Sequence, residues 1–143
     1  MRKPEYSWNE EMGVAKCVLY YKDLEFCGTA YCHPEDRDMK NKLMGQRIAE
    51  KRAILEFLRF IRDYEIKIKL DTLNHYYYGI KQSKNFNKES YEVKSLYRQI
   101  HLLEKDLVLV RQEISDTKNM IKGYIEQKEQ EHNKLRKVIA GRK

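Results

Sequence analysis

The stretch that decides the fold is residues 93–124, VKSLYRQIHLLEKDLVLVRQEISDTKNMIKGY. Apolar side chains recur in it every seven residues, at two positions that lie three residues apart. Such a stripe predicts a long helix that buries one side against another helix. We call this set of residues the heptad stripe, and its expected interface residues are Val93, Leu96, Ile100, Leu103, Leu107, Val110, Ile114, Ile121 and Tyr124.

The heptad stripe does not specify which helix covers it. One interpretation is a homo-oligomer, either a dimer or a higher bundle, in which Asp106 would attract Arg111 of a parallel second chain. The other is a monomeric bundle, in which the long helix folds back on an earlier helix of its own chain. Lys128 and Glu131 stand where apolar residues are expected, so the C-terminal end of the stripe should be its weaker part.

Two runs of strand-forming residues lie near the N-terminus. Val14–Tyr21 and Leu24–Cys32 flank the polar break 22–23, and together they predict a β-hairpin. An isolated hairpin is marginally stable in water, so one of its faces should pack on a helix. The face that carries Gly28 and Ala30 would allow that helix to approach closely.

A helical segment is predicted to follow the hairpin. Apolar residues recur at intervals of three and four from Leu43 onward, and the small residues Ala49 and Ala53 would receive the hairpin. The segment Glu65–Leu70 fits both strand alternation and a continued helix. We favour a helix that is broken or kinked near residue 65 and that stops at Gly79.

Ser90 is the predicted N-cap of the long helix, because its hydroxyl can accept a hydrogen bond from an unpaired backbone N–H. The predicted fold class is therefore mostly α with a small β-hairpin. The N-terminal hairpin packs on helices, and a long coiled-coil helix forms the C-terminal part. We expect two domains: residues 1–82, a β-hairpin plus helices, and residues 83–143, the long coiled-coil helix with a basic tail.

Charge and composition restrict the partners and the compartment. The formal net charge is +7, and residues 72–143 hold 15 Lys and Arg against 9 Asp and Glu. Basic segments favour nucleic acid or acidic protein surfaces. No apolar run approaches the roughly 20 residues of a membrane span, and no signal-peptide core follows Met1. We therefore expect no membrane partner and a cytoplasmic protein, and an odd number of cysteines fits a reducing compartment.

Few residues suggest chemistry at a reactive centre. Cys17, Cys27, Cys32 and His33 could together supply the four ligands of a zinc ion, but no CxxC pair is present, and buried packing cysteines are the simpler interpretation. The run 33–36, His-Pro-Glu-Asp, could serve acid–base chemistry or simply cap a turn. No phosphate loop, nucleophile elbow or dinucleotide fingerprint occurs. We expect neither an enzyme nor a cofactor.

Tyrosines and lysines mark a candidate binding surface. Aromatic rings among cations can stack on nucleic-acid bases or grip a protein surface, although a run of tyrosines at a helix end can also simply be buried. The candidate residues for binding a partner protein or nucleic acid are Tyr76, Tyr77, Tyr78, Lys81, Lys84 and Lys88, and in the basic tail Lys134, Arg136 and Lys137.

Several blocks of the sequence carry a family resemblance. They are residues 26–36 (FCGTAYCHPED), Gly45, Ile48–Ala53, Asn85–Glu92 and Arg98–Glu104. The chain resembles a family of uncharacterised small proteins encoded by phages and prophages of Gram-positive bacteria. The resemblance implies a phage origin and a setting in the cytoplasm of the bacterial host. It implies no activity, although small phage accessory proteins often bind and redirect host machinery.

These observations lead to one main functional hypothesis and two alternatives. We expect a non-enzymatic, phage-encoded accessory protein that self-associates and binds a host protein or nucleoprotein complex. One such target is a host defence complex, which the protein would inhibit. The first alternative is a nucleic-acid-binding protein that uses the basic C-terminal half. The second is a structural or assembly protein of the virion.

Overall fold

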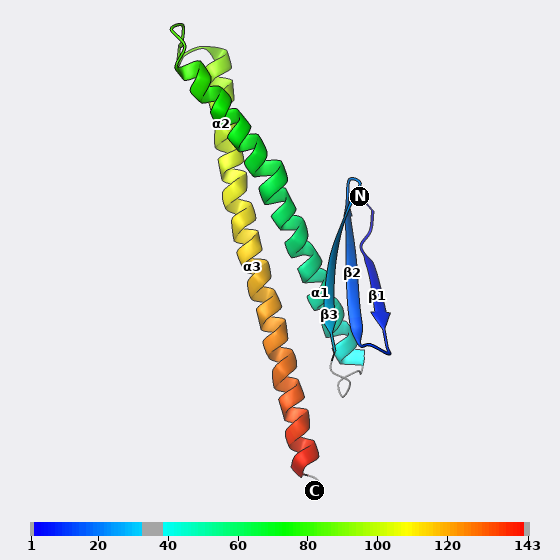
Figure 1. Cartoon of the computed structure of the whole chain (residues 1–143). Helices are drawn as coiled ribbons and strands as arrows, with labels where there is room; N and C mark the ends of the chain where they lie inside the picture. Colours follow the sequence, from blue (N-terminus) through cyan, green and yellow to red (C-terminus); the bar gives the residue numbers. More distant parts are fainter. Residues whose placement is uncertain (1, 33–38, 142–143) are drawn as a thin grey trace. The chain divides into compact units, whose positions relative to one another are not determined.

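The computed structural model describes residues 2–32 and 39–141 (Figure 1). It is mostly helical with a small antiparallel sheet near the N-terminus and a long C-terminal helix, which confirms the predicted fold class. In chain order the elements are β1 (Glu5–Asn9), β2 (Val14–Tyr21), β3 (Leu24–Tyr31), α1 (Met39–Phe60), the π-helix η2 (Ile61–Lys67), α2 (Ile68–Lys81) and α3 (Tyr91–Gly141).

The chain forms two compact units. Unit 1 comprises Met1–Phe57 and Ser115–Lys143, and unit 2 comprises Leu58–Ile114. Helices α1 and α3 each contribute residues to both units. Unit 1 is therefore made of two separate segments of the chain, whereas unit 2 is one continuous segment. The predicted division after residue 82 stays a prediction.

The sheet of unit 1 has three antiparallel strands in the order β1-β2-β3. The predicted hairpin is its β2–β3 part, with Cys17 opposite Gly28. Strand β1 was not predicted; it pairs along β2, and Trp8 lies opposite Ala15. Gly13 makes the turn into β2 with a φ of 63°, a value that glycine adopts without steric strain.

The sheet packs on α1 through an unusually close backbone contact. A Cβ atom added to Gly28 would lie 2.0 Å from the carbonyl oxygen of Ala49 and 2.4 Å from the backbone nitrogen of Ala53. Both alanines are fully buried. Farther along α1, the ring of Phe57 meets Tyr21 and Phe26 edge-on at centroid distances of 5.2 and 5.7 Å. The predicted contact of small residues between hairpin and helix is thus confirmed.

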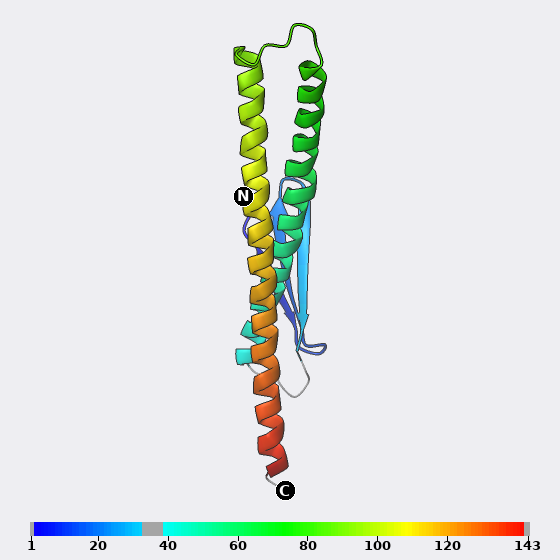
Figure 2. The same cartoon turned by 90° about the vertical axis from the view of Figure 1, so that its left-hand side faces the viewer.

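Unit 2 is a helical hairpin in which α2 and the first half of α3 lie side by side (Figure 2). Its core consists of Leu70 from α2 and of Leu96 and Ile100 from α3. The side chains packed around this core are Leu73, Tyr77, Ile80, Leu103 and Leu107. At the start of α3, the backbone N–H of Val93 donates to Ser90 Oγ at 3.3 Å, which confirms the predicted cap.

The ambiguous segment Glu65–Leu70 is helical. The helix is not broken near residue 65, because the π-helix η2 continues α1 into α2 and the backbone is helical at both boundary residues, Phe60 and Ile68. The predicted stop at Gly79 is wrong, because α2 continues to Lys81. Ile80 lies just beyond the glycine and packs against the Leu70 core. This packing favours a helical backbone at Gly79 and moves the end of α2 downstream.

The contact at Gly28 generates a stability prediction. The variant Gly28→Ala should lower the free energy of unfolding by about 1–3 kcal/mol, because the sheet and α1 must separate to admit a methyl group. Urea denaturation followed by circular dichroism measures this change.

The matched control is Gly79→Ala, because nothing lies within 4 Å of a Cβ atom added at this helical position. This substitution should raise the free energy of unfolding by up to about 1 kcal/mol, through helix propensity alone. A Gly28→Ala variant as stable as the wild type would contradict the close contact.

Candidate functional site

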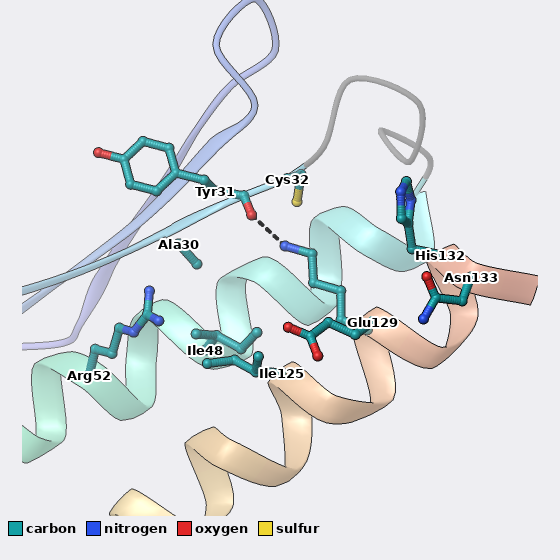
Figure 3. A pocket seen from close by; sticks show the side chains of 10 residues that line it. Ala30, Tyr31, Cys32, Ile48, Arg52, Ile125, Glu129, His132 and Asn133 are labelled. Carbon is teal, nitrogen blue, oxygen red and sulfur yellow. Dashed lines mark hydrogen bonds between the residues drawn. The ribbon is translucent and has the colours of Figure 1, made fainter. Parts of the chain in front are cut away.

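Unit 1 contains an open pocket of about 590 Å³ beside the end of β3 (Figure 3). Its walls come from three elements: residues 30–32 at the end of β3, Ile48 and Arg52 on α1, and residues 125–133 of α3. Figure 3 shows Ile48 and Ile125 together at the floor of this space, with the polar side chains around them. We call it the β3 pocket.

Two cations of the β3 pocket bind the free edge of the sheet. Arg52 Nη1 donates to the carbonyl oxygen of Thr29 at 2.6 Å, and Lys128 Nζ donates to that of Tyr31. Both carbonyls belong to β3, whose only partner strand among the described residues is β2. In the part of the chain that the structure describes, neither cation pairs with a carboxylate.

The sequence did not identify Arg52 or Lys128 as a functional residue. One signal was present: Lys128 stands where the heptad stripe calls for an apolar side chain. That position directs it into unit 1, where it is half-buried and reaches β3. Lys128, which interrupts the stripe, is thus the residue by which α3 contributes a positive charge to the pocket.

The wall of the pocket at the end of β3 is closely packed. The Cys32 thiol is 4% exposed and donates to the carbonyl oxygen of Asn41 at 3.4 Å. A Cβ atom added to Gly45 would lie 3.2 Å from Cys32 Sγ, so α1 also approaches closely here. The backbone N–H of Cys32 donates to the carbonyl oxygen of Gly13 at 2.6 Å. These contacts fix the shape of this wall before any ligand arrives.

The described cysteines do not form the alternative zinc site. Cys17 and Cys32 are buried, whereas Cys27 is exposed. Neighbouring residues of a strand face opposite ways, so Cys27 lies on the face of the sheet away from α1, and Cys17 opposite Gly28 lies on the covered face. His33 and the carboxylates of Glu35 and Asp36 lie outside the described residues. Among residues 2–32 and 39–141, no three potential metal ligands form a cluster.

Burial distinguishes the thiols chemically. It raises the pKa of Cys17 to about 11, and the nearby charge of Glu50 acts in the same direction. Only the thiolate reacts with thiol reagents, so Cys17 should remain almost unreactive at neutral pH. Cys27, which is exposed, should give one fast-reacting thiol per chain in a colorimetric thiol assay on the folded protein.

The variant Cys27→Ser should lose the fast phase, and the control Cys32→Ser should keep it. Reaction of Cys17 should accelerate only as the pH rises toward 11 or when the protein is unfolded. A fast phase that survives in Cys27→Ser would contradict the assignment.

The tyrosine cluster of unit 2 is divided between core and surface. Tyr77 packs inward, and its ring centroid lies 6.4 Å from that of Phe86 and 6.3 Å from that of Tyr97. Tyr76 and Tyr78 are 62% and 61% exposed. The neighbouring lysines Lys81, Lys84 and Lys88 are also exposed. The basic tail residues Lys134, Arg136 and Lys137 are exposed too, and they belong to unit 1.

The heptad stripe is covered largely within its own chain. Val93, Leu96, Ile100, Ile114 and Ile121 are each at most 9% exposed. The remaining members of the stripe, Leu103, Leu107, Val110 and Tyr124, are half-buried. The predicted oligomer interface on the heptad stripe stays a prediction.

A second apolar surface of unit 2 is left uncovered. Ile68 on α2 is 53% exposed, and Leu102 and Leu109 on α3 are 53% and 60% exposed. Two shallow grooves run along the α2–α3 hairpin and share Lys69 and Leu103; Ile68 lines one, and Leu109 lines the other. We call Ile68, Leu102 and Leu109 the apolar flank.

No protein-family model, no curated protein and no solved structure matches this chain. Within the described ranges, no helix combines the length and the apolarity needed to cross a membrane. The β3 pocket and the apolar flank are therefore interpreted from the residues of the chain itself.

Proposed function

We propose that this chain is a non-enzymatic, phage-encoded accessory protein that self-associates and binds a protein complex of the bacterial host. The observation that carries the proposal is the apolar flank. Three large aliphatic side chains, each more than half exposed, lie along one helical hairpin. Large apolar side chains that gather on one exposed surface can mark an interaction site.

The apolar flank is available without rearrangement of unit 2. Leu96 and Ile100 already pack on Leu70, so an oligomer built on these stripe residues would have to displace α2 from α3. Leu102 and Leu109 need no such exchange, because they lie outside that core. We therefore assign self-association to the apolar flank. Lys69, Asp106 and Glu113 line the groove beside Leu109, so the lysine of one chain would attract an acid of the second chain.

Self-association is tested by sedimentation velocity at micromolar concentration. The wild type should sediment as a dimer or larger species, and the double variant Leu102→Glu/Leu109→Glu should sediment as a monomer, because buried charges oppose the apolar contact. The control Lys105→Glu makes the same change in net charge at another exposed position of α3 and should leave the oligomer intact.

Strictly monomeric wild-type protein would refute self-association. The partner is sought by affinity purification of the tagged chain from host cells, with the double variant alongside. Recovery of a stoichiometric host complex by the wild type and by Lys105→Glu, but not by the double variant, supports the proposal. Equal recovery by the double variant would assign host binding to another surface.

Nucleic-acid binding is the second candidate, because exposed Tyr76 and Tyr78 lie close in sequence to three exposed lysines. Fluorescence anisotropy with a single-stranded oligonucleotide at low salt tests it. Replacing Lys81, Lys84 and Lys88 by Gln should weaken binding. The slope of log affinity against log salt concentration should also become shallower, by the equivalent of up to about three phosphate contacts.

The matched control replaces the tail residues Lys134, Arg136 and Lys137 by Gln, which removes the same charge from unit 1. If only this control weakens binding, the tail rather than the tyrosine surface holds the nucleic acid. No binding by the wild type at low salt would exclude the candidate.

A further inference from the structure

The β3 pocket combines an apolar floor with two cations that lack a carboxylate partner among the described residues. Ile48 is 2% exposed, and Ala30 beside it is also 2% exposed. Arg52 and Lys128 are both half-buried, and each donates a hydrogen bond to a backbone carbonyl of β3. A backbone carbonyl carries no net charge, so these bonds orient the two side chains but do not neutralise them.

Both cations keep hydrogen-bonding capacity for another group. A guanidinium has five N–H donors and an ammonium has three, and the bonds to Thr29 and Tyr31 use one donor of each. No described carboxylate lies within ion-pair distance of Arg52 or Lys128, and a charge held without such a pair in partly apolar surroundings is unfavourable. A negatively charged group in the pocket would recover this cost and accept the remaining hydrogen bonds.

We propose that the β3 pocket binds a small organic acid. Its carboxylate contacts Lys128, Arg52 adds a second positive charge to the same pocket, and its apolar body lies against Ile48 and Ile125. The volume of about 590 Å³ falls within the range of small-molecule sites, roughly 300–1,000 Å³. The wall at Cys32 is fixed by its close contacts with Asn41 and Gly45, so the ligand meets a largely preformed surface there.

The charges that line the pocket favour a single negative charge on the ligand. Glu129 also lines the pocket, and its carboxylate would repel a second negative charge. His132 and Asn133 complete the polar side of the pocket. A monoanion with an apolar body therefore fits better than a phosphate dianion. The inference concerns unit 1 alone, so it is independent of the apolar flank of unit 2.

Isothermal titration of the full chain with three probe acids of increasing bulk, octanoate, phenylacetate and naphthoate, tests the proposal. At least one acid should bind, and its neutral amide should bind about tenfold more weakly or worse, because it loses the charge-assisted bonds. Lys128→Gln should weaken binding of the acid by a similar factor and leave binding of the amide unchanged.

Ile125→Trp should abolish binding of acid and amide by filling the pocket while both cations remain. The control Lys122→Gln removes one charge from an exposed position of α3 and should bind like the wild type. Thermal melts establish that each variant is folded. Equal affinity for acid and amide, unchanged affinity in both Lys128→Gln and Ile125→Trp, or no binding of any of the three acids would overturn the proposal.

Discussion

The backbone contact between β3 and α1 at Gly28 is the constraint on which unit 1 depends. Only a residue without a side chain fits there, because the carbonyl of Ala49 and the amide of Ala53 occupy the space of a Cβ atom. At this distance Arg52, on the same turn of α1, reaches the carbonyl of Thr29. A wider separation would open the core beneath the sheet and remove one wall of the β3 pocket. The same small-residue contact therefore supports both the fold and the candidate site.

Unit 2 depends on a different interaction, the packing of Leu70 on Leu96 and Ile100. These last two residues belong to the stripe from which a coiled coil was predicted. A seven-residue repeat states which side of a helix is buried, but it does not state whether the covering helix belongs to the same chain. In unit 2 the helix α2 of the same chain covers this part of the stripe. Leu102 and Leu109 remain exposed and are the apolar surface available to other molecules.

Local pattern predicted the elements better than it predicted the site. The β2–β3 hairpin, the glycine contact and the Ser90 cap follow from residues close together in sequence. Strand β1 was missed because its five residues are largely polar and exposed, so they form a strand only through pairing with β2. The pocket was missed for a related reason: Tyr31 and Lys128 are 97 residues apart, and no spacing rule connects them.

The hydrogen bonds from Arg52 and Lys128 to β3 also affect how this protein behaves at high concentration. An unpaired strand edge offers carbonyls on which a strand from another molecule can add, and repeated addition produces insoluble sheets. Here two outward carbonyls of the edge strand are already occupied, and each occupant brings a positive charge that repels an identical edge. Crowded copies of the chain are thereby discouraged from joining sheet to sheet, and association is left to the helices.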